Sequence, residues 1–496
     1  MNSVIKTLYI TTISLSIGSL LWFTVTNIKS SGWILSLIIA ILLITVPLTL
    51  FINKGAKRAL QKLIIFTKKR KYIAIIAVLA SILGSLIIRF YIYLNFSYDP
   101  ISDPTTFYES SIRISQGHGI TGDTYIAFFP YLAAYTGVLG FAMHMISDPW
   151  LSVIVLNSTF DIMTALVIYL IVRLFTKKGS LLPSVGAIMW LINPFSVLLS
   201  VVSLPISAVN FFISLSILVS ILLIKHFKKS EIFKTWILSV LLGLTLALGS
   251  SLRPVFVIFI IAISLVLVLS AVLSKTKLNK LLLASSSVLT LFICYTLLQH
   301  LNIGIVSNLT SIETAKNSSG WSVFVGANKE SNGKWNIEDE YEMHNMCKNL
   351  NRNNCHQELI HAGVDRYKSY GIIDSLKLMT RKLYVFSSNQ DNIYNVDTSV
   401  IGYEGSNMKK VFMFYLKTYL LFTLSISILY LVSLYKQRIS NNHSLYTLLI
   451  TLAFLGLFIS TALVETSERY AQVVYPIIVI LATLGIGNIV KNKVPR

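Results

Sequence analysis

Long apolar runs alternate with short polar segments along most of this chain. The runs are about 20 residues long, which is the length that an α-helix needs to cross the hydrocarbon core of a bilayer. A transmembrane β-barrel would show short segments of alternating polarity, and the sequence lacks them. The pattern therefore predicts an all-α polytopic membrane protein with about 12 transmembrane helices. The predicted spans are residues 7–27, 32–52, 73–95, 151–175, 181–200, 205–225, 236–251, 255–273, 281–299, 411–433, 445–463 and 470–489.

Composition agrees with this pattern, because 54% of the 496 residues are apolar and only 13% are charged, against roughly 25% charged in soluble domains. The net charge of +21 comes from Lys and Arg residues between alternate apolar runs. Segment 53–72 alone holds eight of them and no acid. Such segments face the cytoplasm. The charge thus indicates orientation rather than nucleic-acid binding, and it predicts a multi-pass cell-membrane protein with both termini in the cytoplasm.

The same rule divides the chain into five parts. Residues 125–147 are apolar enough to cross, but the charge rule favours a juxtamembrane or re-entrant helix within the first outer loop. Within the second large polar segment, Gly320–Asn328 is strand- or turn-like, 338–385 is helical, and 372–386 is amphipathic and suits a membrane surface. The predicted parts are an N-terminal hairpin (1–54), a basic cytoplasmic linker (55–72), a core (73–299) with the outer loop 96–150, an extracytoplasmic cap (300–410) and the C-terminal spans (411–496).

Polar groups close to the membrane are few, and their cost favours a functional role. All of them except Asp161 fall at the outer boundary. Arginine binds phosphate through two parallel hydrogen bonds and stays charged, and a nearby carboxylate can accept the proton of an incoming hydroxyl. The set therefore suits an anionic lipid-linked substrate. Its members are Arg89, Asp99, Asp103, Asp161, Arg253, Glu465, Glu468 and Arg469.

Each of these residues also has a structural interpretation. Asp103 before Pro104 is typical of a helix N-terminus, and Asp99 before a proline is typical of a turn. The three arginines could extend to lipid headgroups, and Asp161 could pair with an arginine or with Asn157 inside the bundle. Two further pairs carry little signal: His118 and His144 lack metal-ligand spacing, and Cys347 and Cys355 could be a disulfide or two free thiols.

Several short motifs resemble GT-C membrane glycosyltransferases, specifically the protein mannosyltransferase-like group, glycosyltransferase family 39, and its bacterial relatives. The resemblance spans residues 73–489. The matching pieces are Ile101-Ser-Asp-Pro-Thr-Thr-Phe-Tyr, Gly117-His-Gly-Ile-Thr, Phe129-Pro-Tyr, Gly137-Val-Leu-Gly, Leu252-Arg-Pro, Gly320-Trp with Gly326-Ala-Asn and Asn332-Gly-Lys-Trp, and Glu468-Arg-Tyr with Tyr475-Pro.

The resemblance implies a GT-C fold, a catalytic aspartate at Asp103 and a polyprenyl-phosphate sugar as donor. It implies that Arg253 and Arg469 bind the donor phosphate. The chain departs from the family where many members carry acids, at Pro104 and in Val202-Ser-Leu-Pro. A divalent metal is therefore left open and is not predicted, and no other cofactor is predicted.

The sequence thus predicts an inverting hexosyltransferase that moves a sugar from a polyprenyl phosphate to an extracytoplasmic glycan, glycolipid or protein. Asp103 is the predicted general base. The predicted substrate-binding residues are Arg253, Arg469, Arg89, Tyr108 and Glu109. Two alternatives remain at this stage: a polysaccharide polymerase or ligase that uses lipid-linked oligosaccharide, and a lipid or polysaccharide flippase.

Overall fold

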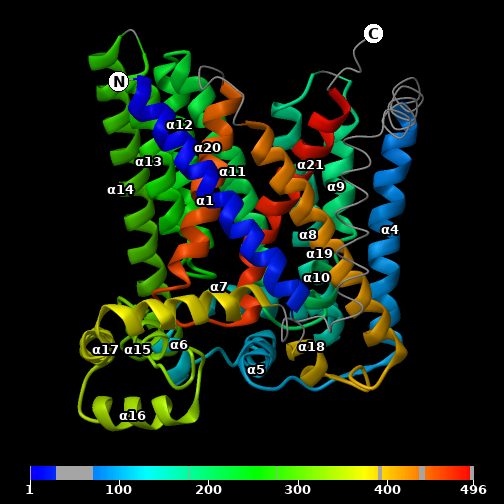
Figure 1. Cartoon of the computed structure of the whole chain (residues 1–496). Helices are drawn as coiled ribbons and strands as arrows, with labels where there is room; N and C mark the ends of the chain where they lie inside the picture. The colour runs from blue at the N-terminus through cyan, green and yellow to red at the C-terminus, as the bar shows by residue number, and fades with distance from the viewer. Residues whose placement is uncertain are drawn as a thin grey trace.

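The protein is a bundle of long apolar helices with a group of shorter elements at one end (Figure 1). The computed structural model describes residues 2–29, 71–177, 179–274, 276–388, 394–434 and 442–491. Within these ranges nine helices are long and apolar enough to cross a membrane. This confirms an all-α polytopic membrane protein, while the GT-C fold and the count of about 12 spans stay predictions. The predicted span at 32–52 lies outside the described residues.

The bundle helices match the predicted apolar runs closely, because each of those runs supplies an uninterrupted apolar surface. Asp148 accepts a hydrogen bond from the backbone N–H of Leu151 at the start of one of them, where Pro149 takes the first helical turn. The long helices are α1 (Asn2–Lys29), α4 (Lys71–Asn95), α8 (Pro149–Leu174), α11 (Ile206–Lys228), α12 (Ile232–Ser250), α14 (Lys277–Thr310), α19 (Asn407–Leu434), α20 (Asn442–Ser460) and α21 (Tyr475–Lys491), the last preceded by the 3-10 helix η1 (Glu468–Val474).

Two predicted spans are shorter than expected. The run 181–200 forms two helices, α9 (Leu182–Leu191) and α10 (Pro194–Leu199). The break falls at Asn193-Pro194, because proline lacks the N–H that would continue the helix and disfavours helical backbone in the residue before it. Asn193 then caps the second helix by accepting from the N–H of Phe195 at 3.2 Å. The run 255–273 forms α13 (Val257–Val272), which has 16 residues.

The first outer loop contains three helices, α5 (Asp103–Ser115), α6 (Thr124–Phe128) and α7 (Leu132–Ile146). The apolar segment 125–147 is thus two helices on either side of Pro130. The longer of them, α7, has 15 residues and is shorter than a transmembrane helix. It packs against α5 and α8.

The cap contains α15 (Ser319–Gly326), α16 (Ile337–Cys347), α17 (Arg352–Ser388) and α18 (Tyr394–Ser399). The strand- or turn-like prediction for 320–328 is wrong. Trp321, Phe324 and Val325 recur at helical spacing and are buried, and α15 packs against α17. The predicted helix 338–385 is correct apart from a turn after Cys347 and a kink at Gly371. The φ of Gly371 is 69°, a value that glycine adopts more readily than other residues.

A small antiparallel sheet joins the first outer loop to the end of the cap. It consists of β1 (Ser97–Tyr98) and β2 (Val400–Ile401), with Ser97 opposite Ile401 and Tyr98 opposite Val400. Figure 1 shows α5, α6 and α15–α18 gathered at one end of the bundle, with the start of α1 and the end of α21 at the other end. The candidate site lies where the outer loop and the cap meet.

Candidate active site

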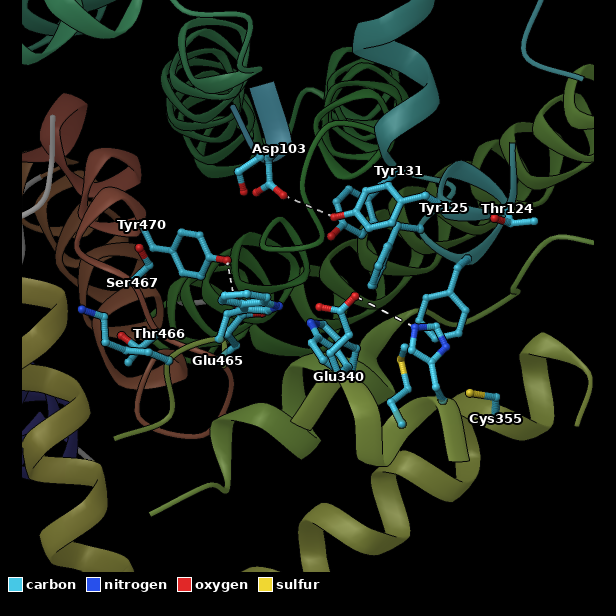
Figure 2. Close-up of a pocket in the computed structure, with 18 of the residues that line it drawn as sticks. Asp103, Thr124, Tyr125, Tyr131, Glu340, Cys355, Glu465, Thr466, Ser467 and Tyr470 are labelled. Atoms are coloured by element: carbon cyan, nitrogen blue, oxygen red, sulfur yellow. Dashed lines mark hydrogen bonds and ion pairs between the residues drawn. The ribbon is translucent and has the colours of Figure 1, made fainter. Parts of the chain in front are cut away.

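A pocket of about 750 Å³ lies between the first outer loop, the cap and the turn before η1. Asp103 lies on one side of it, and Glu340 of the cap lies on the opposite side (Figure 2). Segments far apart in the sequence build its walls. Its lining includes Asp103, Tyr125, Phe128, Tyr131, Trp321, Lys334, Trp335, Glu340, Met343, His344, Cys347, Asn351, Cys355, Tyr394, Glu465, Glu468, Arg469 and Tyr470.

Asp103 is the first residue of α5, and its side chain faces this pocket rather than capping the helix. Ser102, with a φ of 66°, occupies the N-cap position and makes no side-chain cap bond. One carboxylate oxygen of Asp103 lies 2.5 Å from Nη2 of Arg469, and the other accepts a longer hydrogen bond of 3.3 Å from the Tyr125 hydroxyl. The positive end of the α5 dipole adds to the stabilisation of the charged carboxylate. One-third of the Asp103 side chain remains exposed, so a substrate can reach it.

Arg469 and Arg253 lie around the same aromatic ring. The guanidinium of Arg253 lies 4.0 Å from the centre of the Tyr470 ring, and that of Arg469 lies 5.5 Å from it. The Tyr470 hydroxyl donates to Glu465 at 3.1 Å (Figure 2). Burial raises the pKa of Glu465, while the charge of Arg469 opposes that rise. The structure therefore brings the two predicted phosphate-binding arginines to the same tyrosine ring. Arg469 lines the pocket, whereas Arg253 does not belong to its lining.

Arg89 has a different environment. Its guanidinium lies 2.6 Å from Asp161, and both side chains are 2% exposed. It also donates to the hydroxyls of Ser85 and Ser200. Arg89 does not line the pocket, and it joins α4, α8 and the broken α9–α10 segment inside the bundle. Of the two interpretations of Asp161 from the sequence, the structure shows pairing with an arginine.

Tyr108 and Glu109, also predicted to bind substrate, lie on α5 away from the lining of the pocket. The Tyr108 ring packs edge-on against Tyr98 with 5.1 Å between ring centres, and burial raises its pKa to about 12. Glu109 is exposed. Asp99 is exposed too, which leaves Asp103 as the carboxylate of this stretch that faces the pocket.

The cap wall of the pocket is fixed at both ends of α16. At its start, the buried carboxylate of Asp339 accepts hydrogen bonds from the side chains of Asn328, Asn336 and Arg366 at 2.6–3.0 Å. At its end, Cys347 forms a disulfide with Cys355. Of the two alternatives that the sequence left open for these cysteines, a disulfide or two free thiols, the structure has the disulfide. It is also the reason why the turn between α16 and α17 stays close to the pocket.

The sequence did not point to Tyr125 and Glu340 of the lining. Neither has a spacing that would link it to Asp103, because they meet it only through the fold. Lys334 and Trp335 stand in the Asn332-Gly-Lys-Trp motif of the resemblance, but no role was predicted for them. Lys334 pairs with the nearly buried Glu468 at 3.0 Å and thereby connects the cap to the residue before Arg469. Among the described residues, no group of three or more His, Cys, Asp or Glu side chains could hold a metal ion.

No model of a known protein family matches the chain, and no curated protein matches it. The evidence that bears on function is therefore the geometry and the charges of the pocket.

Proposed function

We propose that this protein is a membrane glycosyltransferase that transfers a sugar from a polyprenyl phosphate to an acceptor hydroxyl. The observation that carries the proposal is the contact between Asp103 and Arg469 in an accessible pocket. A transfer of this kind needs a base for the acceptor proton and a cation for the departing phosphate, and this pair supplies both at one place.

In the proposed reaction, Asp103 takes the proton of the acceptor hydroxyl. The acceptor oxygen attacks the anomeric carbon from the face opposite the phosphate, so the new bond forms with inversion as the carbon–oxygen bond to phosphate breaks. A guanidinium has five N–H donors. Arg469 can therefore keep one contact with Asp103 while others stabilise the phosphate, and Arg253 adds a second positive charge behind the Tyr470 ring.

An apolar groove supports a lipid-linked donor. It has a volume of about 330 Å³ and lies between α7, α8, α11, α12 and α14. Leu252, next to Arg253, is part of its lining, together with side chains such as Phe160, Phe212 and Leu301. A donor whose isoprenoid chain occupies this groove would have its phosphate at the level of Arg253.

Two features support an extracytoplasmic position for the pocket. The disulfide between Cys347 and Cys355 belongs to an oxidising compartment. Basic residues gather at the opposite end of the bundle, at the end of α11 (Lys225 and Lys228) and the start of α14 (Lys277 and Lys280). Both features agree with cytoplasmic termini and an outer cap.

The test is the substitution Asp103→Asn in the purified, reconstituted protein. We expect the transfer rate to fall by about 100-fold or more, the range for loss of a general base, while donor binding stays close to that of the wild type. The matched control is Asp99→Asn, since Asp99 is exposed and lies four residues away on the same segment. Full activity of the Asp103→Asn protein would refute the assignment.

The choice of donor separates this proposal from its alternatives. Transfer from a lipid-linked monosaccharide supports it. A reaction that requires a lipid-linked oligosaccharide would indicate a polymerase or ligase. Movement of the lipid across a liposome membrane without sugar transfer would indicate a flippase.

A further inference from the structure

The pocket extends well beyond the Asp103–Arg469 pair, toward α16. Glu340, Met343 and His344 recur at helical spacing, so one face of this helix lines the cavity. Trp335 precedes the helix and lies at the rim of the pocket, with 55% of its side chain exposed. Trp321 of α15 and Phe128 of α6 line the pocket as well. This part of the cavity, lined by Trp335, α16, Trp321 and Phe128, is called the α16 slot below.

Contacts within the protein fix the shape of the α16 slot. The Asp339 hydrogen bonds and the Cys347–Cys355 disulfide hold both ends of α16, and Arg366 also pairs with Glu342 on the next turn at 2.6 Å. A rigid binding surface avoids the entropic cost of ordering side chains and loops on binding.

The chemistry of the slot suits a sugar ring. A pyranose presents C–H groups on its flat faces, which pack on aromatic rings, and hydroxyls around its edge, which need hydrogen-bond partners. Trp335 supplies most of the exposed aromatic surface, because Trp321 is 8% exposed and the Phe128 ring packs against that of His356 with 4.0 Å between ring centres. Glu340 and His344, 4.0 Å apart and 38% and 68% exposed, supply an acceptor and a ring nitrogen at the edge. An apolar chain would leave these polar groups without water or partners.

We propose that the α16 slot binds a sugar ring of the acceptor, so that the acceptor is an oligosaccharide or polysaccharide chain. The inference rests on the proposed function, because it assigns the acceptor side of the same pocket. The chain would lie with one ring on Trp335 and the hydroxyl to be modified near Asp103. Unglycosylated peptides lack the ring that the slot recognises.

The test measures binding separately from transfer. The probes are the neutral and anionic oligosaccharides released by mild acid from the host's own envelope polysaccharides. They are titrated against the full-length protein in detergent, with a lipid-linked donor absent. We expect the wild type to bind a subset of them, Trp335→Ala to weaken that binding by about tenfold, and Trp335→Phe to remain within about threefold. The KM for the same acceptor should rise in parallel in the Trp335→Ala protein.

The matched control is Trp236→Ala. Trp236 is 47% exposed at the start of α12, and it is not part of the lining of the pocket. Its replacement should leave binding unchanged. The inference is overturned if the wild type binds none of the oligosaccharides, if Trp335→Ala binds them as the wild type does, or if a peptide is the acceptor. Oligosaccharide binding by a wild-type protein that shows no transfer would overturn the proposed function and leave the α16 slot in place.

Discussion

Arg89 and Arg469 show that the level of a residue in the membrane does not determine its role. Both were predicted at the outer boundary, and both pair with a carboxylate. The pair of Arg89 and Asp161 is sealed inside the bundle, whereas the pair of Arg469 and Asp103 opens into a pocket. The difference arises from which face of its helix each arginine occupies and what packs there. A single charge in an apolar run of the sequence does not show which face of the helix it occupies or what packs against that face.

Asp103 and Arg469 lie 366 residues apart, and no periodicity links them. The sequence nonetheless brought both to attention, through their rarity near the membrane and through the resemblance of the surrounding motifs to a family of glycosyltransferases. Tyr125 was missed because aromatic residues are common here, with 11% of the chain, and nothing marks the few that face a cavity. Trp335 stands in a motif of the resemblance, but no role was predicted for it. Candidate charges could thus be predicted, but their neighbours could not.

Lys382 is a buried amine in the cap. It donates to the backbone oxygen of Gly326 at 2.8 Å and to the Tyr367 hydroxyl at 3.0 Å, and its side chain is fully buried. Burial lowers its pKa to about 7 from an ordinary value of 10.5, although Glu465 opposes the shift. The proton on this amine is therefore held less tightly in the folded protein than in the unfolded chain.

This shift predicts a pH dependence of stability. Between pH 7 and about 10 the unfolded chain keeps the proton on Lys382 while the folded protein loses it, so unfolding takes up a proton and stability rises with pH, by at most about 1.4 kcal/mol per unit. Below pH 7 both states are protonated and the cost of burying the charge is fully present. Lys382→Met removes this dependence. Its Tm relative to the wild type should therefore fall as the pH is raised from 7 to 9.

The matched substitution is Lys377→Met on the same helix, because the Lys377 side chain is 63% exposed. Thermal unfolding followed by tryptophan fluorescence gives all three Tm values. A constant difference between wild type and Lys382→Met over this pH range would show that the amine stays charged in the fold.

At the scale of elements, the cap holds the segment that carries Arg469. The N–H of Glu465 donates to the oxygen of Ser322 at 2.6 Å, and the N–H of Thr466 donates to that of Gly333 at 2.9 Å. Gly326 lies directly against this segment. A Cβ atom there would lie 2.4 Å from the carbonyl carbon of Val464 and 2.6 Å from the nitrogen of Glu465. The end of α15 and the turn before η1 thus fit together only without a side chain at this position.

We therefore expect Gly326→Ala to displace the turn before η1 and to lower transfer activity by about tenfold or more, since a small misplacement of catalytic groups is costly. Gly304→Ala in α14 is the matched control, because a Cβ there has no atom within 4 Å. Transfer assays on the two reconstituted proteins, with folding checked by gel filtration, decide the point. Equal activities would mean that α15 does not position Arg469.

The elements themselves were predictable to different degrees. Helices such as α11 can be predicted directly from the sequence, because a continuous apolar run of this length is typical of a membrane-spanning helix. The α9–α10 break was missed although Asn193-Pro194 marks it, since hydropathy averages over a single proline. The α15 prediction failed because its Val, Trp and Phe residues favour strands locally, and contact with α17 outweighs that preference.

At the scale of the whole molecule, charge and architecture agree. Lys and Arg gather at the ends of helices remote from the cap, and the cap carries the disulfide. The kinked helix α17 runs across the ends of the long helices (Figure 1). On that helix Ile372 and Ile373 are 81% and 71% exposed, as expected of a helix at a lipid surface. The orientation predicted from charge stays a prediction, whereas the contact of the cap with the pocket around Asp103 had no signal in the sequence.

This orientation predicts a labelling pattern. In a Cys294→Ala background, a membrane-impermeant maleimide added to intact cells should label Lys316→Cys in the cap. It should leave Lys229→Cys, between α11 and α12, unlabelled until the cells are broken. Both positions are exposed, so access alone decides the result. The reverse pattern would place the pocket on the cytoplasmic side.

The disulfide at the end of α16 determines the order in which the parts of the pocket are completed. Asp103 and Arg469 lie outside the segment that the disulfide closes, but the wall opposite them is complete only after Cys347 and Cys355 are oxidised. On the proposed orientation that happens after export. If the proposed function holds, a newly inserted copy thus has Asp103 and Arg469 before the α16 wall is complete, and the proposed ability to modify a glycan is the last property the protein acquires.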